Sequence, residues 1–470
     1  MKNNLKNAGT ALVVGGSIAG MTSARVLSDL FQKVIIVERD AFPEEPGVRK
    51  GLPQSDHIHV LMPQGAFVLE RLFPGLFREM RKNGSFIIDG VRDLAFKFFG
   101  SWMPRKESGL PYFIQSRAFL DWHVHSRLET IDNIETIENA DVTSLLTNSE
   151  KNQITGVVIN GKDGKREIAA DLVVNAAGRG SRVPRWLEEL GYMRAPKSEI
   201  GLGITYASRV FEAPDVAYDW YANVIYPKAP ESSRLGYLFR QEKGRWIVTL
   251  SSYFDEPAPI TDESFMAFAR SLEEPDIYEF LQKATPVTEI KTFKYPSARR
   301  RHYEKVRRFP AGLITLGSAV CSFNPIWGQG MTSAILQADA LGDCLRRYGL
   351  RSDLFRFYYK KQKKICDIPW LLAGASDFRY PEVTGKRPFG LGLVNWYNGK
   401  FFQMMANDLE AYKEFAKVIY FMQGPEALFK PSMIGKVIKH LFSGKKAILK
   451  RPRLSKDLQA QPMDFSAYGL

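Results

Sequence analysis

A glycine turn between a strand and a helix, close to the first residue, constrains the fold of this chain most. The apolar run Ala11–Val14 leads into Gly15-Gly-Ser-Ile-Ala-Gly20, and apolar residues then recur at helical spacing over Met21–Leu30. A second apolar run, Val34–Val37, is followed by Glu38. This order of strand, turn, helix and strand predicts a βαβ unit with parallel strands.

The residues of this turn are those that a dinucleotide site requires. Glycines let a pyrophosphate approach backbone N–H groups at the start of a helix, and an acid after the second strand holds the ribose hydroxyls. Ser17 replaces the usual middle glycine with another small residue. Arg39 lies either near the adenine or on the surface, and the alternative for the whole turn is a packing role. The predicted dinucleotide contacts are Gly15, Ser17, Ile18, Ala19, Gly20 and Glu38.

Two later segments extend the prediction. The strand Gly312–Leu316 leads through a kinked, glycine-rich loop into a helix at Met331–Leu345. The positive end of that helix would stabilise negative charge on a reduced flavin, although the loop also fits an ordinary helix cap. Asp171–Arg182 reads as a strand that runs into a turn at Gly178. In a two-part dinucleotide fold such a turn closes over the cofactor, and the alternative is a plain strand-to-loop junction.

These three segments resemble, in order and separation, those of the FAD-dependent monooxygenases of the aromatic-hydroxylase fold. The nearest resemblance is to bacterial flavin epoxidases that act on linear polyenes in polyether antibiotic pathways. Further matching segments are Val37–Pro46, Arg49–Gln54, His57–His59, Ser116–Asp121 and Pro325–Met331. The resemblance implies FAD contacts from Arg49, Lys50, Arg117, Gly178, Gly317, Ser318, Pro325, Gly328, Gly330 and Met331.

The implied fold class is α/β, with a Rossmann-like FAD-binding domain, an inserted antiparallel-sheet substrate domain and a helical C-terminal region. Alternating apolar and polar residues at 201–212 and 234–253 predict the antiparallel sheet. Strands are also expected at 156–159 and 167–176. The expected boundaries are 8–190 and 299–350 for the FAD-binding segments, 191–298 for the substrate domain and 351–470 for the helical region.

Two positions depart from the family pattern. Gly317-Ser318 stands in place of a Gly-Asp pair, and a serine hydroxyl would bind the ribityl chain without the aspartate's charge. Ala177-Gly178 stands where aromatic hydroxylases carry an Asp-Gly pair associated with NADPH use. The electron source is therefore open between NADPH and a separate flavin reductase.

The resemblance implies an enzyme that inserts one oxygen atom of O2, through a flavin C4a-hydroperoxide, into an apolar substrate. The closest reaction is epoxidation of a polyene or isoprenoid C=C, which needs no dedicated side-chain base, so we name no catalytic residue. Two alternatives stay open. One is an isoprenoid double-bond reductase similar to geranylgeranyl reductases, and the other is a degenerate flavoprotein that binds a lipid or partner without turnover.

Composition and residue spacing exclude several classes of protein and indicate where the protein is located. Apolar residues make up 45% and charged residues 25% of 470 residues, which excludes a disordered or collagen-like chain. Three cysteines and the histidine pairs show no metal-ligand spacing, so we predict no metal site. Neither a signal peptide nor a run of ~18 apolar residues is evident, so we expect a cytoplasmic protein.

A basic segment lies near the C-terminus of a chain whose net charge is +14. Residues 430–456 contain nine Lys or Arg and no acid, and apolar residues recur there at helical spacing. This predicts a basic amphipathic helix that contacts a membrane surface, docks an acidic carrier domain or a reductase, or packs on the fold with a solvated face. No nucleic-acid-binding motif is present, so we expect no nucleic-acid partner.

Overall fold

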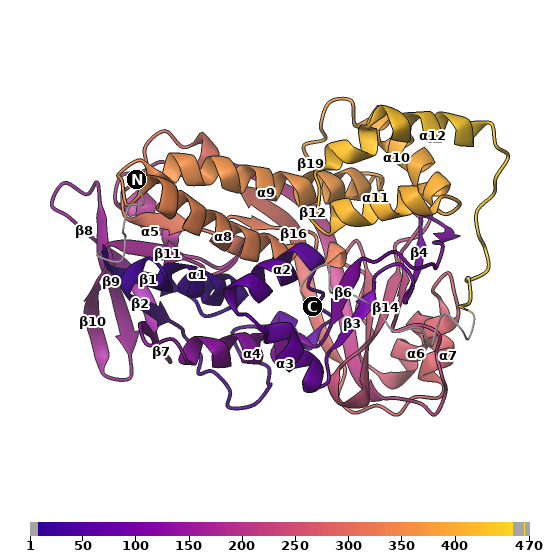
Figure 1. Cartoon of the computed structure of the whole chain (residues 1–470), viewed down its shortest axis with the longest axis horizontal. Coiled ribbons are helices and arrows are strands. Elements are labelled where there is room, and N and C mark those ends of the chain that lie inside the picture. Colours follow the sequence, from indigo (N-terminus) through magenta and orange to yellow (C-terminus); the bar gives the residue numbers. More distant parts are fainter. Residues whose placement is uncertain (1–7, 455–464, 466–470) are drawn as a thin grey trace.

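The computed structural model describes residues 8–454 and Phe465. The predicted βαβ unit is present, and it forms the centre of a five-stranded parallel sheet with the order β17-β11-β1-β2-β7 (Figure 1). The helix starts three residues earlier than the apolar spacing indicates, directly after Ser17. The elements are β1 (Ala8–Val14), α1 (Ile18–Ser28), β2 (Phe31–Val37), β7 (Ile134–Ile137), β11 (Leu172–Asn175) and β17 (Leu313–Thr315).

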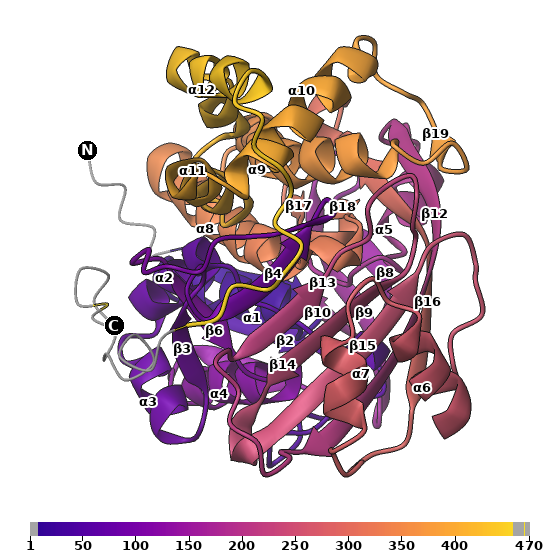
Figure 2. The ribbon, with the colours of Figure 1, turned by 90° about the vertical axis from the view of Figure 1, so that its right-hand side faces the viewer.

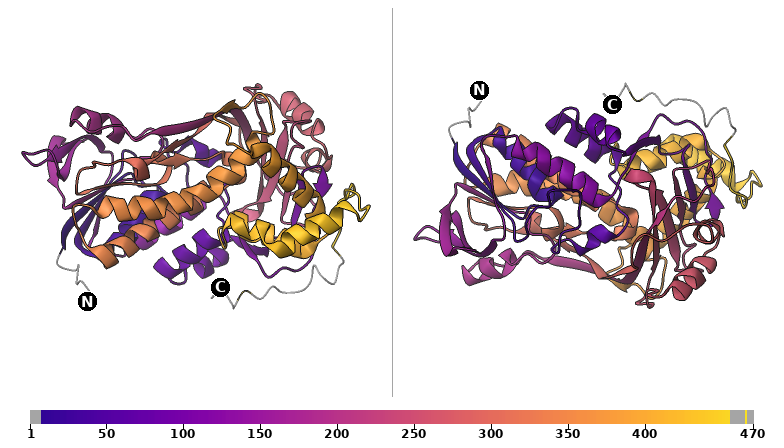
Figure 3. Two further views of the ribbon diagram at one scale, coloured as in Figure 1. Left: turned by 90° about the horizontal axis from the view of Figure 1, so that it is seen from above. Right: turned by 90° about the horizontal axis from the view of Figure 1, so that it is seen from below.

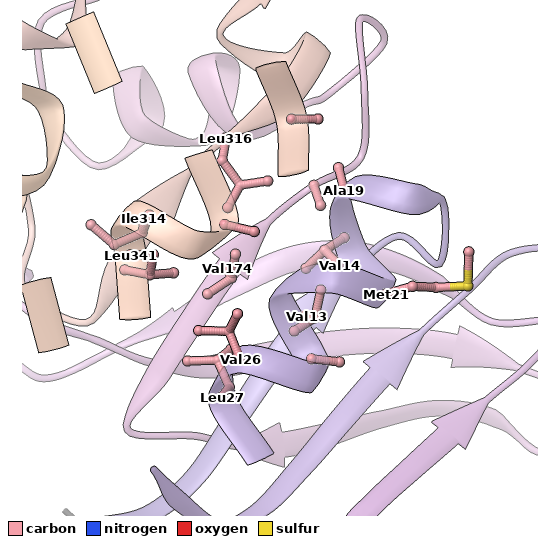
Figure 4. Packing of buried hydrophobic residues seen from close by; sticks show 14 of the residues in the cluster. Val13, Val14, Ala19, Met21, Val26, Leu27, Val174, Ile314, Leu316 and Leu341 are labelled. Atoms are coloured by element: carbon pink, nitrogen blue, oxygen red, sulfur yellow. The ribbon is translucent and has the colours of Figure 1, made fainter. Parts of the chain in front are cut away.

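Helices cover this sheet and form the first core of the molecule. Helix α1 packs against α8 (Gly330–Tyr348), which in turn packs against α9 (Leu354–Asp377) and α2 (Pro63–Leu72). Figure 4 shows Val13, Val26 and Val174 meeting Leu341 between the sheet and these helices. The other elements of this half are α3 (Leu76–Lys82), α4 (Arg117–Glu129), α5 (Val183–Glu189) and the antiparallel strands β8 (Asp141–Thr147), β9 (Ile154–Gly161) and β10 (Gly164–Ala169).

The second half is a nine-stranded sheet, which is antiparallel except where β13 pairs with β4. Its order is β18-β16-β12-β15-β14-β13-β4-β5, with β19 on β12. The strands are β4 (Leu94–Phe98), β5 (Ser101–Trp102), β12 (Lys197–Glu212), β13 (Ala222–Ile225), β14 (Leu235–Arg240), β15 (Arg245–Ser252), β16 (Lys291–Arg301), β18 (Cys321–Ser322) and β19 (Thr384–Gly385). A separate pair, β3 (Phe86–Asp89) and β6 (Pro111–Ile114), lies beside it.

Each face of the nine-stranded sheet is covered by helices (Figure 2). Short helices α6 (Asp262–Arg270) and α7 (Asp276–Leu281) cover one face through an apolar core around Trp246 and Phe280. The C-terminal helices α10 (Leu391–Met405), α11 (Leu409–Ile419) and α12 (Pro431–Leu441) cover the other. Seen from above and below, these helices lie over the end of the molecule away from β8–β10 (Figure 3).

Three expectations need correction. The strand expected at 167–176 is two strands, because Asp171 hydrogen-bonds the Thr10 N–H at 2.8 Å where the chain passes from β10 into the parallel sheet. The stretch 8–190 is not wholly part of the cofactor half, since β4 and β5 extend the nine-stranded sheet. The amphipathic helix expected over 430–456 ends at Leu441, and Gly444 adopts φ +63° shortly after; residues 455–456 lie outside the described part.

Candidate active site

A cavity of about 800 Å³ runs between the parallel sheet and the nine-stranded sheet. One end, here called the cofactor end, is formed by the β1–α1 turn, the end of β2, residues 175–182 and the segment before α8. Most of the predicted FAD contacts line the cavity: Gly15, Ser17, Ile18, Ala19, Glu38, Arg39, Arg117, Gly178, Ser318, Pro325, Gly328, Gly330 and Met331. The structure therefore brings together residues that are more than 300 positions apart in the sequence.

Four predicted contacts lie outside the cavity wall. Gly20 and Gly317 sit behind it, where they allow close packing: a Cβ on Gly20 would lie 1.7 Å from the Gly15 carbonyl oxygen, and one on Gly317 would lie 3.1 Å from the Ala19 Cβ. Arg49 is buried behind Glu38, and Lys50 is exposed. Lys50 is thus an exposed residue outside the cavity lining, although the next residue, Gly51, lines the cavity.

Glu38 and Arg49 organise the adenosine side of the cofactor end. Glu38 Oε2 accepts a hydrogen bond from the Gly16 N–H at 2.5 Å, and Arg49 Nη2 donates to the Gly16 carbonyl at 2.9 Å. The Arg49 guanidinium lies 4.4 Å from the Phe42 ring centroid and 3.6 Å from Glu38 Oε2. Its buried Nη1 makes no hydrogen bond within the described chain. These contacts fix the Glu38 carboxylate at the edge of the cavity, beside the β1–α1 turn.

The features of the cofactor end fit a dinucleotide. Ser17, which precedes α1, makes no side-chain capping bond, so backbone N–H groups at the start of the helix are available to a pyrophosphate. Gly15 has φ +99°, and a Cβ there would lie 2.9 Å from the Ala176 carbonyl oxygen. Four arginines and two acids line this end, which favours an anionic ligand: Arg39, Arg117, Arg179, Arg182, Glu38 and Asp141.

The segment Cys321–Gly328, here called loop 321–328, is held from both halves. The hydroxyls of Tyr226 and Tyr237 both donate to the Ile326 carbonyl, the second at 2.8 Å. The Asn324 side chain accepts from the Ile326 N–H at 3.1 Å and donates to Asp377 Oδ1 at 2.7 Å. Loop 321–328 therefore has a fixed position against the cavity.

Asp377 lies buried at the end of α9 beneath this loop. Tyr253 donates its hydroxyl to Asp377 Oδ1 at 3.0 Å, while Oδ2 has no hydrogen-bond partner within the described residues. Burial raises the pKa of Asp377 to about 7, against the lowering effect of the bonds from Asn324 and Tyr253. Sequence reasoning missed this residue because its partners lie 53 and 124 positions away.

The opposite end of the cavity, here called the aromatic end, is lined by side chains of the nine-stranded sheet, of β6, of α11 and of Tyr420 directly after it. None of the described residues that form it is Asp, Glu, Lys or Arg. They are Leu94, Phe96, Tyr112, Tyr206, Val224, Tyr226, Tyr237, Phe239, Phe293, Tyr412, Phe415, Ala416, Ile419 and Tyr420. The contribution of α11 was not predicted, because an amphipathic helix gives no sign of which surface it covers.

Two histidines lie between the ends. His57 Nδ1 is 2.8 Å from Ser208 Oγ, and burial lowers the pKa of His57 to about 4. His59 Nδ1 donates to the His57 carbonyl at 3.0 Å, and burial, with a smaller effect of Arg117, lowers its pKa to about 3. Both rings are neutral at physiological pH. Within residues 8–454, no three His, Cys, Asp or Glu side chains form a group that could hold a metal ion.

Known structures share this architecture, although no family model matches the chain. PqsL, titled a probable FAD-dependent monooxygenase from Pseudomonas aeruginosa, is 19% identical with a TM-score of 0.58, covering 79% of this chain and 97% of its own. The flavin-dependent brominase Bmp2 is 13% identical with a TM-score of 0.65, covering 91% and 99%. The p-nitrophenol 4-monooxygenase PnpA of Pseudomonas putida is 16% identical with a TM-score of 0.59, covering 88% and 99%.

The fold is thus that of the FAD-dependent monooxygenases of the aromatic-hydroxylase type, as the sequence predicted. Among curated proteins, Protein Rv3254 of Mycobacterium tuberculosis is 34% identical over 80% of this chain and 81% of its own. The chain belongs to the family of that protein. The FAD-dependent monooxygenase paxM of Penicillium paxilli is 23% identical over 79% of this chain and 76% of its own.

Proposed function

We propose that the protein is an FAD-dependent monooxygenase that transfers one oxygen atom of O2 to an apolar substrate, by epoxidation of a polyene or isoprenoid C=C. The observation that supports this most is the continuity of the cavity, which joins the end that carries the β1–α1 turn and Glu38 to the aromatic end, whose lining residues carry no charge. FAD, once bound and reduced, would supply the activation of O2. The substrate C=C, O2, two electrons and two protons would give the epoxide and water.

The protein's own residues would bind, orient and exclude water. The first turn of α1 would hold the pyrophosphate and Glu38 the ribose, while loop 321–328 would lie against the flavin ring. The rings of Tyr206, Tyr237 and Phe239 would hold an apolar chain beside it. Burial raises the pKa of Tyr206 and Tyr237 well above the ordinary value, so these hydroxyls stay neutral and carry no charge into the cavity.

The residues that line the aromatic end also indicate the class of substrate. The Tyr206 side chain lines the cavity and its buried hydroxyl lies near Ser251, so the aromatic end would accept a substrate with one neutral polar group. A charged substrate would lose its hydration without gaining a partner at the aromatic end. The names of the relatives do not favour the reductase alternative, since those compared in sequence or fold include monooxygenases.

The test begins with the purified protein. Its absorbance spectrum and the cofactor released by heating should identify bound FAD. The enzyme, reduced without air and then mixed with ¹⁸O2 and a polyene, should give a product that carries one labelled oxygen. Reduction by NADPH alone, compared with reduction by a separate flavin reductase, would identify the electron source. Polyene consumption without label, or conversion under argon, would contradict the proposal.

A further inference from the structure

Large exposed apolar side chains gather at the C-terminal helices. Six of them define what we call the cap surface, which lies on the outside of the molecule at one end (Figure 2): Phe389, Leu393, Trp396, Phe429, Ile438 and Phe442. Phe389 is fully exposed, and Phe442 and Leu393 are 85% and 72% exposed. We propose that the cap surface binds an anionic phospholipid bilayer, which deepens the proposed function because it would bring an apolar substrate to the enzyme.

The apolar residues form stripes rather than scattered points. Leu393 and Trp396 lie three residues apart on α10, so they share one face, while Phe389 comes directly before Gly390, the residue that precedes the helix. On α12, Met433 and Val437 pack inward, while Ile438 and Leu441 are exposed. The apolar face of α12 is thus wider than the part of it that packs on the protein. This is typical of a helix that lies at a membrane–water interface.

The two stripes are joined by direct contact. The Tyr397 ring of α10 stacks on Phe429 with centroids 5.0 Å apart, and its hydroxyl donates to the Leu428 carbonyl at 2.7 Å. Phe429 ends the short 3-10 helix that leads into α12, and α10 packs against α12. Exposed apolar side chains of α10 and of the segment that leads into α12 are therefore carried by elements that contact each other.

The charges around the cap surface are positive. No acid occurs in residues 384–405 or 427–454. Lys439, Lys445 and Lys446 form no ion pair with any described residue, while Lys436 pairs with Asp408 at 3.0 Å. Free lysines beside exposed aromatic and aliphatic side chains match a surface of anionic headgroups over acyl chains.

The chain that follows α12, which includes Lys445 and Lys446, is anchored to the rest of the fold by residues 448–454. The segment after α12 crosses the nine-stranded sheet, where the Ile448 N–H donates to Ser101 Oγ at 2.8 Å and the Leu454 N–H to Asp219 Oδ2 at 2.8 Å. Arg451 pairs with Asp219 and Asp276 at 2.9 and 2.6 Å. Little chain entropy would be lost on binding, which favours association.

The form of the surface favours a bilayer over an acidic protein domain. Phe389 and Phe442 have most of their surface in water, so neither ring is seated in a pocket. A protein partner would need matching pockets, whereas the headgroup region accommodates aromatic and aliphatic side chains of any arrangement. Helix α11 lies between the cap surface and the aromatic end of the cavity, because it packs against α10 and its side chains line that end. No described helix is long and apolar enough to cross a membrane, so the contact would be superficial.

The test is sedimentation of the full-length protein with vesicles of phosphatidylcholine, alone or with an equal amount of phosphatidylglycerol. We expect binding to the anionic vesicles, a decrease of about tenfold in affinity for Leu393→Ser/Phe442→Ser, and loss of the preference for phosphatidylglycerol in Lys439→Glu/Lys446→Glu. Met193→Ser/Ile260→Ser is the matched control, because these side chains are 85% and 73% exposed elsewhere and should not affect binding.

The proposal is overturned if the wild-type protein stays in the supernatant, or if the cap and control variants bind equally well. Binding to a purified acidic acyl carrier domain, lost in the cap variants and absent with vesicles, would overturn it in favour of that partner. Vesicle binding requires no turnover, and FAD content and oxygenation of a detergent-dispersed polyene are measured separately. Failure here is therefore distinguishable from failure of the proposed function.

Discussion

The Asn324 side-chain amide donates a hydrogen bond to Asp377 Oδ1 at 2.7 Å, and this bond joins loop 321–328 to the end of α9. The two residues lie 53 positions apart in the sequence; Asn324 lines the cavity and Asp377 is buried next to it. Tyr253, from the end of the nine-stranded sheet, completes the cluster by contacting both side chains. The position of loop 321–328 thus depends on how the end of α9 packs against that sheet.

The raised pKa of Asp377 predicts a pH-dependent effect of Asp377→Asn. Because the folded-state pKa is about 7 and the unfolded value is 3.8, the folded wild type binds more protons between these values. Its stability contribution is therefore lost as pH rises through this range. The amide keeps the acceptor for Asn324 and Tyr253 and has no charge to bury. Relative to wild type, the variant should gain stability from pH 5 to pH 8, by on the order of a few kcal/mol. Urea midpoints at both values check this, and a constant difference would contradict it.

Two tyrosines that share one acceptor predict non-additive costs. Tyr226→Phe or Tyr237→Phe alone leaves the Ile326 carbonyl with one donor, so each should cost about 1 kcal/mol or less. The double variant leaves a buried carbonyl unpaired and should cost more than the sum of the single changes. A double-mutant cycle by urea unfolding measures the excess. Additive costs would mean that the two hydroxyls act independently.

The contact between Gly20 and Gly15 predicts that Gly20→Ala abolishes FAD binding or folding. The new Cβ would lie 1.7 Å from a backbone carbonyl oxygen, so α1 would have to move away from the turn. Gly435→Ala is the control, since that Cβ in α12 meets nothing within 4 Å and should stabilise the helix by about 0.5–1 kcal/mol. Flavin content and thermal melting distinguish the two. Normal FAD content in the Gly20 variant would refute the predicted packing role.

The position of Glu38 predicts weaker FAD binding in Glu38→Gln. The carboxylate already lies at the Gly16 N–H, and loss of its charge weakens hydrogen bonds to ribose hydroxyls. We expect the dissociation constant for FAD to rise about tenfold. Quenching of flavin fluorescence during titration of the apoprotein measures it. Glu135→Gln, at an exposed pair with Lys33 on the same sheet, should bind FAD as the wild type does.

A carboxylate at position 318 is expected to strengthen FAD binding, in contrast to the loss of the carboxylate at position 38. Its side chain lines the cavity and is exposed there, so an aspartate fits without displacing a neighbour. Ser318→Asp should lower the FAD dissociation constant severalfold, because a charged acceptor would bind the ribityl hydroxyls more strongly than a serine does. The same titration checks this. An unchanged or higher constant would show that another group binds the ribityl chain in this protein.

The cofactor end could be predicted from the sequence because its residues lie within short segments. The strand, turn, helix and acid that form it follow one another within the single segment Ala11–Glu38. Glycine positions and apolar spacing are local signals, and the structure reproduces them within a few residues. The difference at the start of α1 arises because Ile18–Gly20 pack on the sheet despite lacking a helical pattern of their own.

The aromatic end could not be predicted in the same way. The pairing of β4 with β13 joins residues about 130 positions apart, and no local pattern identifies the partner. Asp377 looks like any polar residue near a helix end until Asn324 and Tyr253 surround it. The wall formed by Tyr412 and Phe415 depends on how α11 is docked, which the spacing of its apolar residues leaves open.

The position of β17 at the edge of the parallel sheet has a consequence for synthesis. The sheet begins with β1 at residues 8–14, yet its last strand, residues 313–315, leaves the ribosome roughly 300 residues later. At about 5–20 residues per second this interval is on the order of tens of seconds. During that time the β1–α1 turn exists without Ser318 and α8, so the wall of the cofactor end is complete only after most of the chain has been translated.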